Sequence, residues 1–297
     1  MKNKYLIFRT DRLGDFLISA ILIKCIKEND PNAHITIIAS KLNSSFIKTF
    51  PYVDNVIELK NRLSDKIVLF FKLRKFLFKN IIIHDNKKRS KIISFFLKYD
   101  KKILISDFLN LSQIEIIKKI LKELNFYYST NSLNFLEHET KLFQNNEKII
   151  QIHFDEKWIY KDYIKKYKKI EPNKDEFLLM LDKIQTYKNL KMIITTGHKS
   201  PEIINAVKQE LNKRKIKLYN DLSFYDLTKI TLKSNILISC HGAISHVASA
   251  NNIKQIDIID KSYNYRRWSS HFRNYQFVYR EEFNILTNNI IKKLKIF

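Results

Sequence analysis

The sequence is poor in glycine, proline and cysteine. It holds three glycines, four prolines and two cysteines in 297 residues, whereas an average glycine content of about 7% would give roughly twenty glycines. So little glycine and proline, beside 45% hydrophobic residues, excludes a collagen-like chain, low-complexity disorder and a Gly/Pro-rich β-sandwich. The two cysteines, Cys25 and Cys240, are too few for a disulfide framework and are typical of a reducing compartment. We therefore expect a globular, cytoplasmic protein with a large core.

Long uncharged apolar runs are also missing. Nowhere do about 18 apolar residues follow one another without a charge, as a membrane-spanning helix requires. The opening residues, MKNKYLIFRTD, contain an apolar stretch of only four residues, which is too short for the core of a signal peptide. We expect neither a membrane-spanning helix nor a signal peptide.

Acidic residues are the minority among the charged ones. The 54 Lys and Arg residues exceed the 30 Asp and Glu residues, so that the formal net charge is +24. An excess of this size indicates an acidic partner, which is a nucleic acid, an anionic membrane face or a phosphorylated substrate. The lysines are spread along the chain without a dense block, so a solvated basic surface explains the charge equally well.

Short apolar runs alternate with helical patterns along the chain. Strands are predicted at 4–8, 34–40, 55–59, 81–83 and 103–105, with helices over 16–26, 64–79, 87–98 and 111–124. After the polar residues 129–147, a second series predicts strands at 148–153, 191–195, 215–218, 235–239 and 255–259, and helices over 174–187, 201–213, 224–233 and 243–250. This alternation is typical of an α/β fold with doubly wound parallel sheets. We expect one Rossmann-like domain over residues 1–140, a linker near 130–147, a second Rossmann-like domain over 148–280, and a last helix within 281–297 that packs back on the body.

All three glycines follow predicted strands, where ligands of parallel sheets bind. Gly14 ends the first strand-to-helix turn, Gly197 follows the strand at 191–195, and Gly242 follows the strand at 235–239. Glycine at such a turn permits a positive φ or the close approach of a ligand. A plain turn or helix cap explains any one of them, and the coincidence of all three favours a ligand.

The first turn, Arg9-Thr10-Asp11-Arg12-Leu13-Gly14-Asp15, carries two cations and two carboxylates. Asp15 stands where a helix begins, and a carboxylate there is stabilised by the free N–H groups of the first turn. Capping alone would explain this residue. The functional interpretation is that Asp15 acts as a general base on a substrate hydroxyl.

A second polar segment, residues 239–246, leaves a strand and enters a helix that is rich in small residues. Free N–H groups at such a helix start suit a diphosphate. His241 and His246 are five residues apart and do not share a helical face, so a metal cluster that joins them to His153 and Asp155 is the weaker interpretation. Neither a dinucleotide-binding glycine fingerprint nor a phosphate-binding P-loop is present.

Together these segments resemble the family-nine glycosyltransferases, the lipopolysaccharide heptosyltransferase family. The resemblance rests on Arg9-x-Asp11-x-x-Gly14-Asp15, on His153-Phe-Asp-Glu-Lys157-Trp158, on Thr196-Gly197-His198 with Glu202, and on Ser239 through His246 followed by Val-Ala-Ser-Ala. These motifs follow one another in order over nearly the whole chain.

The resemblance implies a GT-B fold, in which two Rossmann-like doubly wound domains face each other across a cleft. It implies a metal-independent, inverting sugar transfer from a nucleotide-diphosphate donor, as co-substrate and without a cofactor, to a lipopolysaccharide or other surface-glycan acceptor. Asp15 would remove the proton of the acceptor hydroxyl, Lys157 would neutralise the donor diphosphate, and Glu202 would hold the ribose hydroxyls. The acceptor side would include Arg9, Asp11, Arg12 and Gly14, and the donor side Lys157, Gly197, Glu202, His241, Gly242, Ala243, Ser245 and His246.

One departure from the family pattern concerns the donor sugar. The family has an acidic residue where this chain has His241, and an imidazolium cannot accept hydrogen bonds from sugar hydroxyls as a carboxylate does. The donor therefore need not be ADP-heptose, and a catalytically degenerate member that only binds nucleotide-sugar is one alternative. The other alternative is a basic nucleic-acid-binding protein, which scattered lysines and the absence of a known nucleic-acid module disfavour.

Two further segments have more than one interpretation. Residues 65–83 place Lys72, Arg74, Lys75 and Lys79 among Leu and Phe, so this segment could rest on the anionic inner face of the cytoplasmic membrane. Phenylalanines on both sides of the predicted helix favour an ordinary core helix instead. Residues 263–270 either bring Arg266 and Arg267 to a phosphate or form a surface loop.

Overall fold

The computed structural model describes residues 2–60, 62–108, 110–136, 148–159, 168–187, 190–198 and 200–297. These residues form two compact units by their contacts. The first unit contains residues 1–135 together with Tyr265–His271, and the second contains Leu136–Asn264 and Phe272–Phe297. Most of the predicted linker at 130–147 lies outside the described residues.

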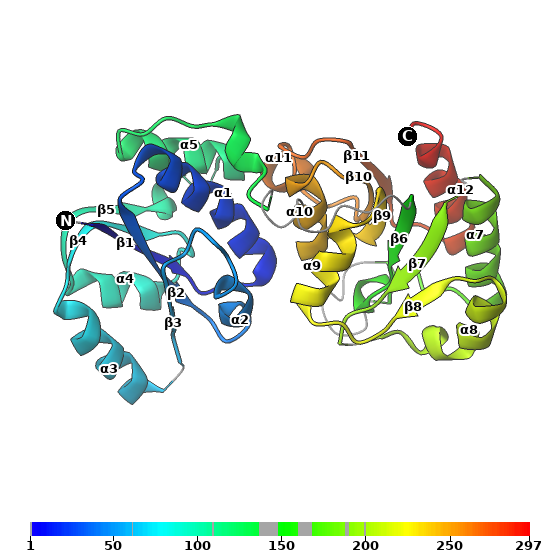
Figure 1. Cartoon of the computed structure of the whole chain (residues 1–297), viewed down its shortest axis with the longest axis horizontal. Helices are drawn as coiled ribbons and strands as arrows, with labels where there is room; N and C mark the ends of the chain where they lie inside the picture. The colour runs from blue at the N-terminus through cyan, green and yellow to red at the C-terminus, as the bar shows by residue number, and fades with distance from the viewer. Residues whose placement is uncertain are drawn as a thin grey trace. The chain divides into compact units, whose positions relative to one another are not determined.

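The first unit is built on a parallel sheet of five strands in the order β3-β2-β1-β4-β5. Figure 1 shows these elements in blue to green. The strands are β1 (Asn3–Arg9), β2 (Ala33–Ala39), β3 (Asn55–Glu58), β4 (Leu77–Ile83) and β5 (Lys98–Leu104), and the helices are α1 (Leu13–Asn29), α2 (Ser44–Ile47), α3 (Leu63–Arg74), α4 (Lys88–Phe95) and α5 (Gln113–Glu123), with 3-10 turns at Ile105–Phe108 and Thr130–Leu133.

The second unit is built on a parallel sheet of six strands in the order β11-β10-β9-β6-β7-β8. Its strands are β6 (Ile149–His153), β7 (Lys191–Thr195), β8 (Lys217–Tyr219), β9 (Ile236–Cys240), β10 (Lys254–Ile259) and β11 (Tyr275–Tyr279). Its helices are α7 (Lys174–Tyr187), α8 (Glu202–Lys213), α9 (Phe224–Leu232), α10 (Ala243–Ala250) and α12 (Phe283–Leu294), with a 3-10 turn at Glu156–Trp158, and α11 (Tyr265–Trp268) groups with the first unit.

Both strand orders are doubly wound. In each sheet the first strand lies in the middle, and the chain builds outward on one side before it returns to the other. The carboxyl ends of the two strands at this switch point are where such sheets bind ligands. The switch point lies between β1 and β4 in the first unit and between β6 and β9 in the second. The prediction of doubly wound parallel sheets is confirmed.

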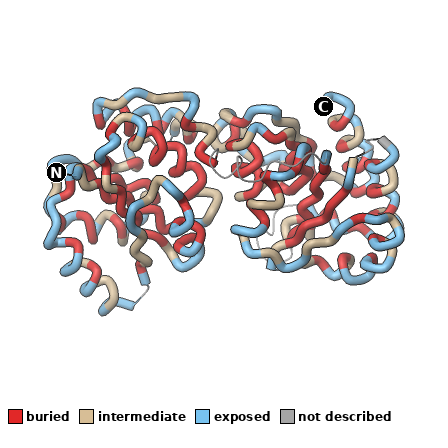
Figure 2. The backbone as a smooth tube through the Cα atoms, in the orientation of Figure 1, coloured by how far each residue is buried: buried red, intermediate tan, exposed pale blue. Residues whose placement is uncertain are grey.

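The cores lie between each sheet and its helices, and the central strands are among the most buried segments of the described chain (Figure 2). In the second unit, side chains of α7, α8 and α12 pack with β6, β7, β9 and β10 in one apolar cluster. This cluster includes Leu286, Ile290 and Leu294, so the last helix is part of the second unit's core.

The segment at 65–83 differs from its prediction. The helix ends at Arg74 and the chain continues as strand β4, because residues from Leu77 onward pair with β5. Only Leu69 and Leu73 of α3 are buried, and the tube of this helix is largely exposed in Figure 2. The helix packs on the core through Leu69 and Leu73, with Phe70 partly buried beside them, and its remaining apolar side chains are exposed. The expectation of a core helix followed by a strand is therefore confirmed for one face of α3 only.

None of the three glycines adopts the positive φ that was considered for them. The left-handed positions among the described residues are Asn86, Asn125, Lys215, Asp221, Asn252 and Asn274. Asn and Asp tolerate this conformation better than other residues with a Cβ. Turns that other proteins close with glycine are thus closed here mostly by Asn and Asp.

Candidate functional site

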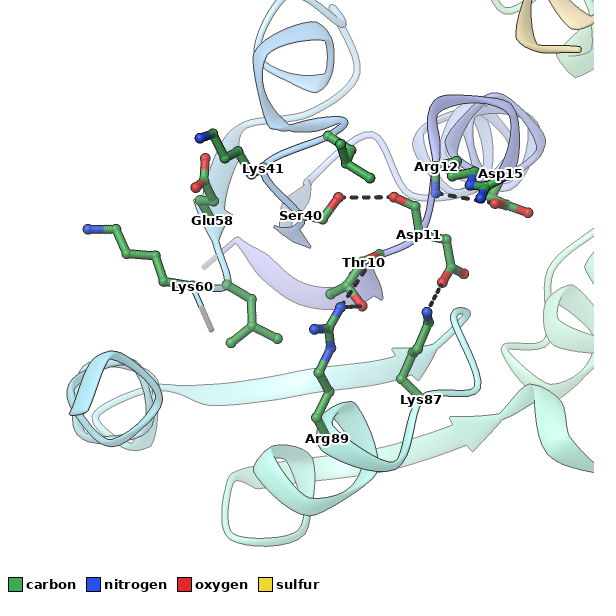
Figure 3. A pocket seen from close by; sticks show the side chains of 12 residues that line it. Thr10, Asp11, Arg12, Asp15, Ser40, Lys41, Glu58, Lys60, Lys87 and Arg89 are labelled. Atoms are coloured by element: carbon green, nitrogen blue, oxygen red, sulfur yellow. Dashed lines mark hydrogen bonds and ion pairs between the residues drawn. The ribbon is translucent and has the colours of Figure 1, made fainter. Parts of the chain in front are cut away.

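A pocket of about 790 Å³ opens at the switch point of the first sheet. It lies at the carboxyl ends of four strands, and Figure 3 shows Glu58 and Lys60 on its left, Asp15 at the upper right and the basic side chains that follow β4 below. The pocket is lined by Thr10, Asp11, Arg12 and Asp15 after β1, by Ser40, Lys41 and Leu42 after β2, by Glu58, Leu59 and Lys60 at β3, and by Lys87 and Arg89 after β4.

The lining of this pocket is more basic than acidic. Five of its side chains are Lys or Arg, and three are Asp or Glu. Both signs occur close together, since Lys87 Nζ lies 3.0 Å from Asp11 Oδ1. Such a lining suits a polar ligand that carries negative charge and also has hydroxyl groups to be hydrogen-bonded.

Arg9 supports the pocket from inside the protein. Its side chain is only 4% exposed, and its Nε donates a hydrogen bond of 2.8 Å to the carbonyl oxygen of Asp15. Its Nη1 donates to the carbonyl oxygen of His84 and lies 3.4 Å from Asp11 Oδ2. The guanidinium therefore fixes the turn between β1 and α1 to the neighbouring strand.

The two aspartates of this turn have different environments. Asp11 is largely buried, and this burial raises the pKa of its carboxyl, against the opposing effect of Arg9 and Lys87. Asp15 is partly exposed at the third position of α1, where its Oδ2 accepts a hydrogen bond of 3.3 Å from the Arg12 backbone N–H. The capping role considered for Asp15 is thus present. Its other carboxylate oxygen makes no hydrogen bond within the described part of the chain and is available to a ligand in the pocket.

Behind the pocket lies a fully buried histidine. His84 follows β4, and its Nδ1 lies 2.8 Å from the Ser19 hydroxyl. Burial holds the pKa of His84 well below the usual 6.5, and the Arg9 charge acts in the same direction. The folded protein therefore keeps this imidazole neutral at pH values at which the unfolded chain takes up a proton.

This difference predicts that the free energy of unfolding falls as the pH is lowered, and that the fall begins at pH values above those at which carboxylates titrate. Below pH 6.5 the unfolded state binds a proton that the folded state does not bind, so the free energy of unfolding falls by about 1.4 kcal/mol per pH unit on account of His84. Urea unfolding of wild type and His84→Asn from pH 7 to pH 5 measures the effect. The asparagine amide can still bond to Ser19, and the slope should be smaller in this variant. A slope in His84→Asn equal to that of wild type would contradict the assignment.

The second switch point brings Lys157 to the start of α10. Lys157 follows β6, and Gly242 follows β9 and precedes the first residue of α10. A Cβ built on Gly242 would lie 2.6 Å from Lys157 Nζ and 3.0 Å from its Cε. The φ of Gly242 is −176°, an extended value open to any residue. Glycine at this position is therefore explained by the close approach of the lysine and not by backbone conformation.

Asp155 holds this lysine in place. Its carboxylate is almost fully buried, and its Oδ2 lies 2.6 Å from Lys157 Nζ and 3.4 Å from His153 Nε2. Burial alone would raise the pKa of Asp155, but the Lys157 ammonium and His153 outweigh it and keep the pKa far below its usual range. A permanently ionised carboxylate thus orients an ammonium group toward the free N–H groups of α10, which is an arrangement that suits a phosphate.

His241 belongs to a second polar cluster at the same end of the sheet. Its Nδ1 lies 2.7 Å from Oδ2 of the fully buried Asp257, and its Nε2 lies 2.7 Å from the Tyr263 hydroxyl. The hydroxyls of Ser239 and Ser245 donate to Oδ1 of the same carboxylate, at 3.2 and 2.8 Å. A carboxylate oxygen accepts, so Nδ1 of His241 is assigned as the donor to Asp257, and Nε2 is then left to accept from the Tyr263 hydroxyl.

The remaining predicted donor-side residues are placed less closely together. Ser245 is the third residue of α10 and accepts a 3.2 Å hydrogen bond from the Gly242 N–H, and Ala243 is the first residue of that helix. His246 is buried, with its ring 5.7 Å from the ring of His241. Glu202 is exposed at the first position of α8 and makes no side-chain bond within the described residues. A Cβ on Gly197 would meet nothing within 4 Å, and nothing in the described part of the chain explains this glycine.

Several residues of these sites escaped the sequence analysis. Asp257 lies inside the apolar strand β10, and a lone carboxylate in a buried strand is the signal that could have found it. Lys87 and Arg89 follow β4, whose carboxyl end was predicted correctly at Ile83, and basic side chains just after a parallel strand are the signal that could have found them. As for metals, no group of three or more His, Cys, Asp or Glu side chains in the described ranges is arranged to hold an ion.

Comparison with solved structures identifies the fold. The chain is similar to E. coli heptosyltransferase WaaC with ADP at a TM-score of 0.76 and 10% identity, over 99% of each chain. It is similar to the family 9 glycosyl transferase of Veillonella parvula DSM 2008 at a TM-score of 0.68 and 11% identity, over 99% of this chain and 89% of that one. UDP-GlcNAc 2-epimerase of Methanocaldococcus jannaschii gives a TM-score of 0.60 at 11% identity, over 99% and 92%.

No protein-family model and no curated protein sequence matches the chain. The likeness therefore lies in the structure: this chain has the GT-B fold of the family 9 heptosyltransferases over its whole length, as the motifs in the sequence predicted. The epimerase shares that fold at a lower score, so the chemistry has to be argued from the residues at the two switch points.

Proposed function

We propose that the protein is an inverting, metal-independent glycosyltransferase that moves a sugar from a nucleoside-diphosphate donor to a lipopolysaccharide or other surface-glycan acceptor. The observation that carries the proposal is the ammonium group of Lys157, which a buried carboxylate at 2.6 Å holds against Gly242 at the start of α10. Lysine and helix N–H groups together offer what a diphosphate needs, and they need no metal ion to neutralise it.

The acceptor is assigned to the pocket of the first unit. Its excess of basic side chains favours an anionic glycan, and its position at the carboxyl ends of β1 to β4 is the usual one for a ligand of a parallel sheet. In this assignment Asp15 is the general base, because one of its carboxylate oxygens remains available after the other has capped α1. Asp11 and Lys87, which form an ion pair in the pocket, would hydrogen-bond the acceptor.

The donor sugar is expected to differ from ADP-heptose. Where the related family presents an acidic residue, this chain presents an imidazole that is already bonded to Asp257 and Tyr263. This arrangement offers a ring edge and a tyrosine hydroxyl to the sugar, and the only carboxylate of the cluster is buried behind the imidazole. Glu202, exposed on α8, is assigned to the ribose hydroxyls.

Thermal unfolding with ADP, UDP, GDP or CDP tests the donor site. A ligand present at about a hundred times its Kd stabilises the folded state by about 2.7 kcal/mol, and one of the four should raise the Tm. The matching nucleoside monophosphate should raise it less, because it lacks the second phosphate, and EDTA should not abolish the shift. If none of the four raises the Tm at millimolar concentration, the donor site is wrong.

Product analysis then separates the chemistries that share this fold. Transfer predicts that the sugar of the corresponding nucleoside-diphosphate sugar appears on the acceptor with inverted anomeric configuration, and that the nucleoside diphosphate is released. An epimerase would return a modified sugar without any acceptor, and a degenerate binding protein would show the Tm shift without turnover. Either result would contradict the proposed transfer while leaving the nucleotide site in place.

A further inference from the structure

The exposed apolar side chains of the first unit are concentrated on α3 and α4. Among the described residues, nine of the 16 large hydrophobic side chains that are exposed lie in the segments 63–77 and 92–96. We call these nine the α3–α4 surface; they are Leu63, Ile67, Val68, Phe71, Phe76, Leu77, Ile92, Phe95 and Phe96. A globular protein seldom leaves so many apolar groups together in water unless something covers them.

The two helices form one continuous surface. The rings of Phe70 on α3 and Phe96 after α4 lie 5.9 Å apart, and Phe96 also contacts Phe95 at 5.1 Å. Between the helices lies an apolar groove of about 440 Å³. It is lined by Leu63, Lys66, Ile67, Phe70, Arg89, Ile92, Ile93 and Phe96.

Basic side chains surround this apolar surface. Residues 62–102 contain 13 Lys or Arg and only three Asp, an excess of ten positive charges within a chain whose net charge is +24. Two cations lie over aromatic rings of the surface, Lys102 over Phe95 at 5.7 Å and Lys4 over Phe76 at 4.6 Å. A third, Arg74, lies 6.0 Å from the ring of Phe70, which lines the neighbouring groove. Apolar groups rimmed by cations match the interface of a bilayer with anionic head groups.

We propose that the α3–α4 surface binds an anionic phospholipid bilayer and lies in its interface. None of the helices in the described ranges is long and apolar enough to cross a membrane, so the contact would be peripheral. A second copy of the chain does not fit, because two such surfaces would repel each other through their charge. Nucleic acid fits less well, since five of the nine exposed groups are Leu, Ile or Val, which cannot stack on bases as aromatic rings do.

The position of the surface gives the bilayer a role in the reaction. Arg89 lines both the apolar groove and the acceptor pocket, so a lipid seated at the groove would have its polar head beside the pocket. This inference rests on the proposed function for the identity of the pocket, whereas bilayer binding stands on the α3–α4 surface alone.

Co-sedimentation with vesicles tests the surface. Wild type should pellet with vesicles of equal parts phosphatidylethanolamine and phosphatidylglycerol, and less so with phosphatidylcholine vesicles or at high salt. Phe71→Ser with Phe95→Ser should weaken binding about tenfold or more, because each ring loses its apolar contact with the bilayer. The matched control is Leu179→Ser with Ile285→Ser, which removes two exposed apolar groups from helices of the second unit and should bind as wild type does.

Three results would overturn the proposal. The first is no binding of wild type to the anionic vesicles, and the second is equal binding by the two double variants. The third is displacement of the protein from the vesicles by a short oligonucleotide whose own binding depends on Phe71 and Phe95. The nucleotide-induced Tm shift, measured on the same proteins, keeps this test independent. If the Phe71→Ser, Phe95→Ser double variant keeps the nucleotide-induced Tm shift but no longer binds the vesicles, the result supports the proposed bilayer-binding surface. If wild type binds the vesicles but shows no nucleotide-induced Tm shift, the result contradicts the proposed donor site and leaves the bilayer-binding surface in place.

Discussion

Replacement of Asp15 by Asn is expected to lower the rate of sugar transfer by about 10²–10⁴-fold, which is the range that a positioned general base contributes. The amide oxygen of Asn can still accept the hydrogen bond that the Arg12 N–H donates to the carboxylate. What is lost is the ability to remove a proton from the acceptor hydroxyl. The free energy of unfolding should change by less than about 1 kcal/mol, because only the interaction of a charge with the helix start disappears.

Glu115→Gln is the matched control for this variant. Glu115 holds the same third position of α5, and its Oε2 accepts a 2.8 Å hydrogen bond from the Ser112 N–H, but it does not line the pocket. Both variants lose an equivalent capping charge in the same unit, so a similar small change of Tm is expected. Only Asp15→Asn should lose transfer. Steady-state kinetics with an acceptor and the sugar derivative of the nucleotide that raises the Tm measures the difference, and a near wild-type rate for Asp15→Asn would refute its role as base.

The second large effect is expected from Lys157→Ala, which should damage both stability and donor binding. Removal of the ammonium leaves the buried carboxylate of Asp155 without the cation at 2.6 Å, and breaking a buried ion pair in this way costs about 3–5 kcal/mol. Nucleoside-diphosphate binding should weaken about 10–100-fold, which corresponds to a charge-assisted hydrogen bond.

Two further variants separate these effects. Asp155→Asn combined with Lys157→Ala removes both charges, so much of the lost stability should return while donor binding stays weak. Gly242→Ala keeps both charges but places a Cβ within 2.6 Å of Lys157 Nζ, which displaces a flexible side-chain end at little cost to the fold. Its unfolding free energy should stay within about 1 kcal/mol of wild type, and its nucleotide affinity should fall.

Urea unfolding and titration with the nucleotide diphosphate measure the two quantities on all three variants. If the double variant binds the diphosphate as wild type does, Lys157 serves the fold and not the donor. If Gly242→Ala binds as wild type does, the ammonium does not meet the diphosphate from its position at the start of α10.

Two of the four edge strands were predicted poorly. Strand β11 was missed altogether, and only the end of β5 was found. Both lie at the edge of their sheets, and β5 carries the charged sequence KYDKKIL with mostly exposed side chains. An edge strand need not bury both faces, so it lacks the continuous apolar run that revealed the central strands.

The helix predicted over 64–79 failed for a related reason. Local sequence favours helix through Lys79, but Leu77 and Phe78 gain backbone hydrogen bonds by pairing with Lys98 and Tyr99 of β5. Pairing with a distant segment decides such a boundary, and no local pattern contains it. The same holds for burial, since Phe70 packs partly against the core while its neighbour Phe71 is exposed.

The sequence by itself determined the alternation of strands and helices, the doubly wound sheets, and the three turns that hold Asp15, Gly197 and Gly242. It could do so because buried parallel strands are apolar throughout and because a chain so poor in glycine marks its turns clearly. The tertiary structure alone decided which partners these residues meet: Lys157 against Gly242, Asp257 behind His241, and Arg89 shared between a polar pocket and an apolar groove. These contacts join residues far apart in the chain, and their distances depend on how strands pair at the two switch points, which local propensity does not encode.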